Sequence, residues 1–225
     1  MAKYSIIIPA YNEEEGVKET VLRAYKSNPE AEIIVVDDGS TDKTWTIINS
    51  LKKDRIRVYK HKKNMGKAHA LQTGYSHAKT GVLVTIDADR TYLPEEIPGL
   101  VEEFVKKSYD MLVGTRFKKG FPKKASLLRS LANIAGSAAA SIVLMKRVTD
   151  LTSGLRVMNR KVSGIKVKAR NLEYEAEITS RVVSKKLKYG ESPINVEERE
   201  GKSKLNFVKN CCLFLRAIFA GKFEK

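Results

Sequence analysis

The stretch VLVTIDADRTYLPEEIPGLVEEFVKKS, residues 82–108, decides the fold class because it holds one complete strand-and-helix unit. Its first five residues are uncharged and mostly apolar, as in a strand that is buried on both faces. After the acids Asp87 and Asp89, Pro94 and two glutamates make a favourable helix start. The stretch therefore predicts a buried strand, a polar loop and a helix, in that order.

The same unit recurs through the first half of the chain. Helical stretches of 10–15 residues separate the apolar runs, and Ser40 or Thr41 is predicted to cap the second helix. This alternation predicts an α/β fold with a mainly parallel sheet and helices on both faces. The predicted strands are SIIIPA, AEIIVVDD, IRVYKH, GVLVTIDAD and YDMLVGTRF, and the helices between them are EEGVKETVLRAYKS, TDKTWTIINSLKK, KAHALQTGYSHA and PEEIPGLVEEFVKKS.

The second half is less regular but continues without a linker, a repeat or a low-complexity tract. We expect helices at 126–145, 172–190 and 205–223, and strands at 154–160 and 194–200, with Gly190 ending the middle helix. One domain spanning residues 1–225 fits this pattern best. The longest uncharged run, Ser130–Met145, is shorter than the roughly 20 apolar residues that a spanning helix needs, so no transmembrane helix is predicted.

Charge is distributed unevenly along the chain. Residues 1–115 hold 17 basic and 17 acidic side chains, whereas residues 116–225 hold 25 basic and 9 acidic ones, which accounts for the whole net charge of +16. This asymmetry indicates an anionic partner for the second half, unless the lysines only solvate the surface. The two cysteines are neighbours, Cys211 and Cys212, so no disulfide framework is expected, and the absence of a signal peptide agrees with a reducing compartment.

Polar residues gather where the predicted strands end, which is where open α/β sheets bind ligands. Asp87 and Asp89 would point the same way if the strand continued, and two adjacent carboxylates suit a divalent cation. We therefore predict that they hold Mg²⁺ or Mn²⁺ against a diphosphate. The alternative is that they cap the next helix or form turns.

Three further loops carry candidate ligands. Asp38 follows a core strand, where an acid can accept from a ribose hydroxyl or a base N–H, or can cap a helix. Tyr11 could pack on a base and Glu13 could meet ribose, although this stretch fits a loop and a helix start equally well. Lys67 follows Gly66 at a helix start and either touches phosphate or is a solvated lysine.

Basic residues from distant segments of the second half suit phosphate oxygens, provided that the fold brings them together. They are Arg116, Arg129, Arg199, Lys202 and Lys204. The last helix is strongly apolar on one face and carries Lys209, Arg216 and Lys222. It is interpreted as an amphipathic segment on an anionic bilayer, with docking on the sheet as the alternative.

Taken in order, SIIIPAYNEE, EIIVVDDGSTD, NMGKAHAL, TIDADRTYLPEE, GTR, DLTSGLRVMNR and REGKSKL resemble the inverting family-2 glycosyltransferases of the GT-A fold. Within that family the chain is similar to dolichol-phosphate mannose synthases and related polyprenyl-phosphate glycosyltransferases, over about residues 3–207. The resemblance implies transfer of a sugar from a nucleoside diphosphate sugar to a polyprenyl or dolichyl phosphate. It favours GDP-mannose as donor, with UDP-glucose next.

The resemblance also implies roles for individual residues. Residues 1–115 would bind the nucleotide sugar, 116–205 the acceptor, and 206–225 would face the membrane from its cytoplasmic side as a peripheral segment. Asp87 and Asp89 would hold the metal, and with Arg116 they would be catalytic. Nucleotide-sugar contacts would come from Pro9, Tyr11, Glu13, Val36, Asp38, Lys67, Asp87, Ala88 and Asp89, and phosphate or acceptor contacts from Arg116, Arg129, Ser130, Arg199 and Lys204.

The chain departs from its relatives at two places. Thr91 stands where the synthases often have a glutamine that could be a third metal ligand, and the arginine before S-K-L is one residue closer than usual.

Three other functions remain open on the residues alone. These are transfer to a polysaccharide or protein acceptor, nucleotidyl transfer with the same paired acids, and nucleic-acid binding through the basic half. Clustered acids and few interleaved aromatics argue against nucleic acid as a partner.

Overall fold

The computed structural model describes residues 3–117, 127–171, 173–197 and 207–223, with the side chains of 127–132 and 207–212 outside that description. Its strands form one sheet of seven in the order β3-β2-β1-β4-β6-β5-β7. All pairs are parallel except those of β6, which runs antiparallel to β4 and β5. The strands are β1 (Tyr4–Ala10), β2 (Ala31–Asp37), β3 (Ile56–Lys60), β4 (Val82–Thr85), β5 (Met111–Thr115), β6 (Arg156–Asn159) and β7 (Tyr189–Pro193).

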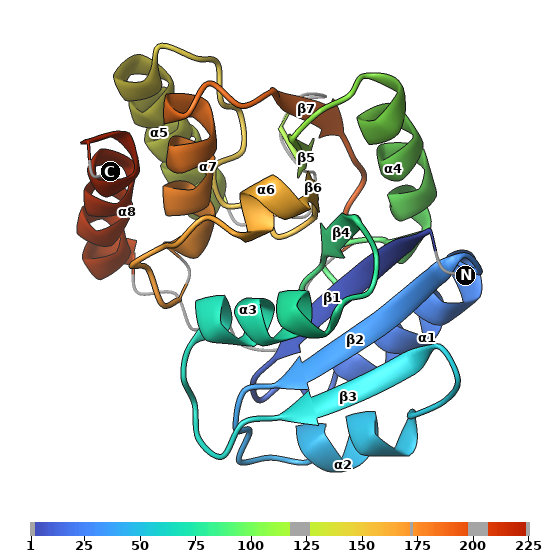
Figure 1. Ribbon diagram of the computed structural model, residues 1–225. Coiled ribbons are helices and arrows are strands. Elements are labelled where there is room, and N and C mark those ends of the chain that lie inside the picture. Colours follow the sequence, from blue (N-terminus) through green and yellow to red (C-terminus); the bar gives the residue numbers. More distant parts are fainter. Residues whose placement is uncertain (1–2, 118–126, 172, 198–206, 224–225) are drawn as a thin grey trace.

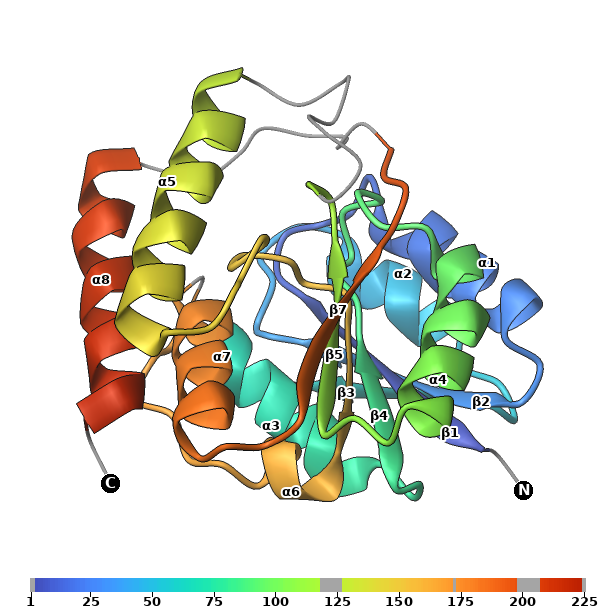
Figure 2. The same ribbon diagram turned by 90° about the horizontal axis from the view of Figure 1, so that it is seen from above.

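Helices cover both faces of the sheet, as Figures 1 and 2 show. α1, α2 and α4 pack on one face, and α3, α5, α7 and α8 on the other. The α/β class predicted from the alternating pattern is therefore confirmed. The helices are α1 (Val17–Ser27), α2 (Thr44–Ser50), α3 (Lys67–His77), the 3₁₀ turn η1 (Pro94–Glu96), α4 (Ile97–Lys106), α5 (Leu127–Leu144), the short α6 (Arg160–Ser163), α7 (Tyr174–Ser184) and α8 (Phe207–Phe223).

The continuous apolar runs in the central strands follow from burial on two sides. Side chains alternate across a strand, so Ile6 and Ile8 of β1 enter the core under α1 and α4, whereas Ile7 enters the core under α3. All three are fully buried. A polar residue at any of these positions would lie in one of the two cores. The middle of β1 is therefore apolar at three successive positions.

One predicted strand is misplaced. Residues 194–200 were expected to form the last strand, but β7 is Tyr189–Pro193, and Val196 makes only an isolated bridge with Tyr92. α7 also ends before Gly190, which lies within β7. A Cβ at Gly190 would lie 2.4 Å from Cζ of Tyr109, so the glycine is required for packing rather than for ending a helix.

The predicted helices at 126–145 and 205–223 correspond to α5 and α8. These two helices lie side by side on the same face of the sheet (Figures 1 and 2). Within the described ranges, neither these nor any other helix combines the length and apolar character needed to span a bilayer. α8 packs on both α5 and α7.

Candidate active site

The loops after β1 and β2 are tied together at the carboxyl edge of the sheet. Asn12, with φ of 53°, receives a hydrogen bond on Oδ1 from the Thr41 amide at 2.8 Å. Its own amide donates to Ser40 Oγ at 3.0 Å. α2 begins only at Thr44, and neither Ser40 nor Thr41 caps it, so that prediction was wrong. Ser40 and Thr41 instead join the loops after β1 and β2 through their contacts with Asn12.

Asp38 is almost fully buried and binds the protein's own backbone. Its carboxylate accepts from the amides of Met65 and Gly66 at 3.0 and 2.7 Å and lies 2.6 Å from His61 Nδ1. With a side chain 3% exposed, Asp38 holds the loop that leads into α3. Its predicted nucleotide contact stays a prediction, and what the geometry supports is a role in shaping the loop.

The other predicted nucleotide contacts divide into two groups by exposure. Pro9, Tyr11 and Glu13 are partly exposed at the end of β1, within reach of a ligand. Val36 and Ala88 are buried in the two hydrophobic cores, so a ligand could meet them only through their backbone.

Lys67 is neither a solvated lysine nor a free one. Its Nζ lies 2.6 Å from Asp87 Oδ1 and 2.5 Å from Glu175 Oε1, and its side chain is 18% exposed. Gly66 before it has φ of 97°, and a Cβ there would lie 2.5 Å from the Arg170 carbonyl oxygen. The glycine thus lets the start of α3 approach the segment before α7, and Lys67 reaches both acids from there.

Sequence reasoning did not identify Glu175. It lies in the first turn of α7, has a side chain 4% exposed, and keeps Oε2 buried without a hydrogen-bond partner among the described residues. Burial raises the pKa of Glu175, and the Lys67 ammonium opposes that rise. The only sequence signal was an acid flanked by Tyr174 and Ala176 at the start of a predicted helix.

The paired acids do not continue the strand. β4 ends at Thr85, the chain bends over residues 88–90, and Arg90 has φ of 65°, so the expectation of an extended path was wrong. Asp89 accepts from the Thr91 amide at 3.1 Å and is 8% exposed, which agrees in part with the turn alternative. Asp87 is more accessible, with a side chain 26% exposed.

Two glycines let the acidic loop pack tightly. A Cβ on Gly154 would lie 2.3 Å from Asp87 Oδ2, and one on Gly16 would lie 2.8 Å from the Ala88 carbonyl oxygen. The Gly154 amide donates to the Tyr92 hydroxyl at 2.8 Å. Burial, as the largest cause, raises the pKa of Tyr92 to about 12, so this hydroxyl stays protonated at neutral pH. The loop is therefore held on a rigid support.

The donor chemistry of this loop fits a divalent cation only in part. Asp87 already binds a cationic group, and hard oxygens of two carboxylates suit Mg²⁺ or Mn²⁺ when substrate phosphates and water complete the shell. Within the part of the chain that the structure describes, no three His, Cys, Asp or Glu side chains are grouped to hold a metal. The protein thus offers an incomplete site that fits a cation carried with a diphosphate.

Arg116 is committed to a buried partner. Its Nε and one terminal nitrogen (Nη2) donate to the two oxygens of Asp150 at 2.7 and 2.8 Å, and its amide donates to the same carboxylate at 3.0 Å. Burial alone would raise the pKa of Asp150, but the guanidinium and its hydrogen bonds hold that pKa below its usual value. Arg116 therefore has a structural role at the end of β5, which the sequence prediction of phosphate binding did not include.

The remaining acceptor candidates are not brought together by the described structure. Arg129 and Ser130 lie on α5, but their side chains are outside the description, as are residues Arg199 and Lys204 entirely. Their convergence on a phosphate stays a prediction.

Comparison with known proteins is consistent with one family. A family model described as Glycosyl transferase family 2 matches residues 5–164, more than half of the chain. A UDP-N-acetylglucosamine–dolichyl-phosphate N-acetylglucosaminyltransferase from Methanococcus voltae is 31% identical over 211 residues, covering 84% of this chain and 83% of the relative. A polyprenol monophosphomannose synthase from Mycolicibacterium smegmatis is 31% identical over 222 residues, covering 89% and 80%.

Solved structures support the same fold. A crystal structure of glucosyl-3-phosphoglycerate synthase from Mycobacterium tuberculosis with Mn²⁺, uridine diphosphate and glucosyl-3-phosphoglycerate has a TM-score of 0.74 to this chain. The match covers 98% of this chain and 78% of that one at 17% identity, so it establishes the architecture alone.

Proposed function

The chain belongs to glycosyl transferase family 2, and we propose that it transfers a sugar from a nucleoside diphosphate sugar to a polyprenyl or dolichyl phosphate with inversion at the anomeric carbon. The two relatives described above, by name, act on dolichyl or polyprenyl phosphates. The observation that carries the proposal is the acidic loop at the carboxyl edge, where Lys67 and Asp87 lie in contact beside Asp89. With a divalent cation bound to the acids, such a site would suit a leaving diphosphate better than a neutral ligand.

The proposed reaction does not need a strong general base. An oxygen of the acceptor phosphate is already anionic, so it can attack the anomeric carbon while the bond from that carbon to the nucleoside diphosphate breaks. The tasks left to the protein are to position the two substrates and to offset charge on the departing diphosphate. Lys67, which pairs with Asp87, would serve the second task directly, and Asp87 and Asp89 would serve it by holding a cation.

We propose that Asp87 and Asp89 hold Mg²⁺ or Mn²⁺ when the donor is bound. The ion would supply a positive charge that stabilises the leaving diphosphate. Gly16 and Gly154 would keep the loop fixed while Asp87, the more exposed of the two acids, faces the ligand. The nucleotide would lie along the end of β1, with Tyr11 against the base and Glu13 near the ribose.

The acceptor phosphate would meet the basic second half of the chain. Arg116 would contribute mainly by fixing Asp150 at the end of β5, since its guanidinium is already paired. Arg129, Ser130, Arg199 and Lys204 stay proposed contacts from the resemblance.

Donor identity is best tested by product formation. The named relatives use different sugars, mannose in one and N-acetylglucosamine in the other. We favour GDP-mannose and would compare it with UDP-N-acetylglucosamine and UDP-glucose, each labelled in the sugar, with a polyprenyl phosphate and Mg²⁺ or Mn²⁺. Label in an organic extract from one donor would support the function and name the sugar. Donor binding without lipid label from any of them would contradict the proposed acceptor.

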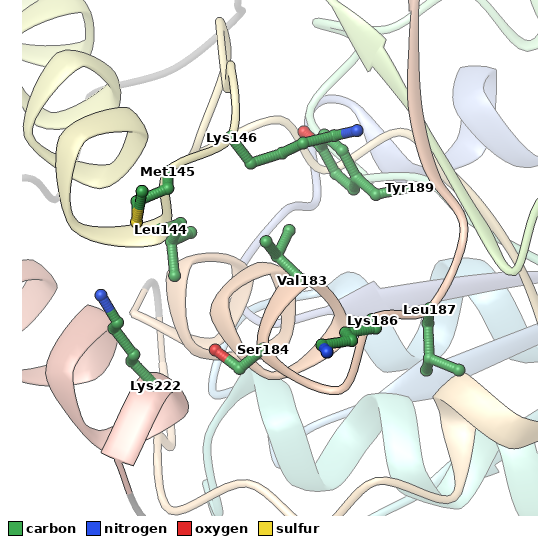
Figure 3. A pocket seen from close by; sticks show the side chains of 9 residues that line it. All are labelled: Leu144, Met145, Lys146, Val183, Ser184, Lys186, Leu187, Tyr189 and Lys222. Atoms are coloured by element: carbon green, nitrogen blue, oxygen red, sulfur yellow. The ribbon is translucent and has the colours of Figure 1, made fainter.

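We further propose that α5 and α8 rest on an anionic membrane surface. Apolar side chains on both helices are open to solvent, with Ile142 78%, Met145 90% and Phe223 67% exposed. Beside them lies an open groove with lysines on its rim and no acidic residue in its lining, as Figure 3 shows. Exposed apolar groups beside basic ones suit an anionic bilayer. The cytoplasmic side of that bilayer stays a prediction.

A vesicle experiment tests this surface. Replacing Phe219 and Phe223 together with serine is expected to weaken binding to phosphatidylglycerol–phosphatidylcholine vesicles by about tenfold or more, because two exposed apolar side chains are lost. Val105→Ser, which removes an exposed apolar side chain from α4 on the opposite face of the sheet, should bind as the unmodified chain does. Equal sedimentation of the double variant and the unmodified chain, or equal binding to pure phosphatidylcholine, would contradict the proposal.

A further inference from the structure

Three elements that are far apart in sequence bring one ammonium group between two carboxylates. Lys67 opens α3, Asp87 follows β4, and Glu175 lies in the first turn of α7. The Lys67 Nζ is 2.6 Å from Asp87 Oδ1 and 2.5 Å from Glu175 Oε1. The ammonium therefore sits on the same carboxylate that the proposed metal would use.

The position of Lys67 is fixed from both sides. The Ala68 amide donates to the Arg170 carbonyl oxygen at 2.9 Å, which joins the start of α3 to the segment before α7. Glu175 is fully enclosed, and its second oxygen has no hydrogen-bond partner among the described residues. Lys67 is the ion-pair partner of Glu175, and the buried Arg156 adds a second positive charge nearby. Glu175 in turn keeps Lys67 beside Asp87.

A divalent cation and an ammonium group cannot share one carboxylate at contact distance without strong repulsion. A cation that arrives alone must therefore displace Lys67 from Asp87. A cation that arrives with a diphosphate brings negative charge, which can accept both the metal and the displaced ammonium. Glu175 would hold the lysine close by during that exchange.

We propose that Lys67 is the resident counter-ion of Asp87, and that Glu175 is a positioning residue that retains Lys67 so that metal binding depends on donor binding. This inference rests on the proposed donor and metal, and it assigns to Glu175 a role in the reaction.

The test is Mn²⁺ binding to the purified full chain, followed by electron paramagnetic resonance of free Mn²⁺, without donor or acceptor. The unmodified chain is expected to bind Mn²⁺ weakly, and Lys67→Met to bind it about tenfold or more tightly, because the competing charge is gone. Adding GDP or UDP should strengthen Mn²⁺ binding in the unmodified chain much more than in Lys67→Met.

Two further variants make the result specific. Lys67→Met with Glu175→Gln removes the chance that Glu175 itself becomes a ligand and lessens any folding defect, so the tighter binding must persist there. Lys63→Met removes the same charge from an exposed position three residues before Gly66 and should leave Mn²⁺ binding unchanged. Circular dichroism would confirm that each variant is folded.

Mn²⁺ binding to the double variant that is no tighter than to the unmodified chain would overturn the counter-ion role. The counter-ion role would also be overturned if GDP or UDP strengthened Mn²⁺ binding equally in the unmodified chain and in Lys67→Met. Because the readout needs neither transfer nor acceptor, the absence of sugar transfer in the donor panel would leave this result interpretable. Conversely, an active enzyme with unchanged Mn²⁺ binding would reject only the role of Lys67.

Discussion

Asp87→Asn and Asp89→Asn are each expected to lower the rate of sugar transfer by about 10² to 10³, the usual loss when one group that stabilises transition-state charge is removed. Asparagine keeps the size of the side chain but not its negative charge, so the cation and the diphosphate would lose a ligand. Asp87→Asn should also release Lys67, because the Lys67 ammonium lies 2.6 Å from the Asp87 carboxylate in the unmodified chain. The measurement is the initial rate of label transfer into lipid at saturating donor and acceptor.

The matched control is Asp54→Asn, which makes the same exchange at an exposed position just before β3, at the opposite edge of the sheet. It should transfer sugar at the rate of the unmodified chain. If both Asp87→Asn and Asp89→Asn were as active as this control, the acidic loop would not be the site of the reaction.

Arg116→Ala is expected to lower the free energy of unfolding by about 3–5 kcal/mol, because it leaves Asp150 buried with its charge unpaired. The side chain of Asp150 is fully enclosed, and besides Arg116 it accepts only from Asn133 among the described side-chain contacts. Urea unfolding at neutral pH measures the loss. Arg147→Ala, at an exposed position in the same basic half, should change the free energy of unfolding by less than about 0.5 kcal/mol.

A second variant separates stability from catalysis at this position. Arg116→Met combined with Asp150→Leu removes both charges and should recover much of the lost stability, since a buried pair can be replaced by apolar groups at little cost. If Arg116 acts mainly by neutralising the buried Asp150, transfer in this double variant should exceed that in Arg116→Ala. A double variant as unstable as Arg116→Ala would contradict the structural role.

The central strands could be predicted from sequence because burial on both faces demands unbroken apolar runs. β1 and β2 satisfy that demand, with Ile7 and Val36 in one core and Ile6 and Val35 in the other. β7 could not, because Tyr189-Gly190-Glu191-Ser192-Pro193 has no β-branched residue and becomes a strand through pairing with β5. Local preference pointed to Ile194 and Val196 instead.

The residues of the candidate site likewise fall into those with a local sequence signal and those whose role depends on distant partners. Asp87 and Asp89 stood out because acids directly follow an apolar strand, which is a local signal. Glu175 and Asp150 did not, because an acid on a helix or in a loop has the same appearance whether it faces water or a buried cation. Their roles depend on partners 108 and 34 residues away, Lys67 and Arg116, and only the folded chain brings those pairs together.

Asp38 has a second role that the sequence did not indicate. An acid at a strand end suggested a nucleotide ligand, which stays a prediction, and in the structure its carboxylate accepts hydrogen bonds from the amides of Met65 and Gly66. Position at the carboxyl edge is therefore necessary for a ligand role but does not distinguish a group that binds substrate from one that shapes the loop around it.

The most direct measurement compares two acceptors that differ only in the phosphate. The purified chain, a labelled nucleoside diphosphate sugar and Mg²⁺ or Mn²⁺ would be incubated with either a polyprenyl phosphate or the polyprenol of the same length, and label in the organic extract would be followed over time. We expect label on the phosphate acceptor alone, and we expect it to be lost when a chelator is added. Equal transfer to the polyprenol, or transfer only to a soluble acceptor, would contradict this expectation.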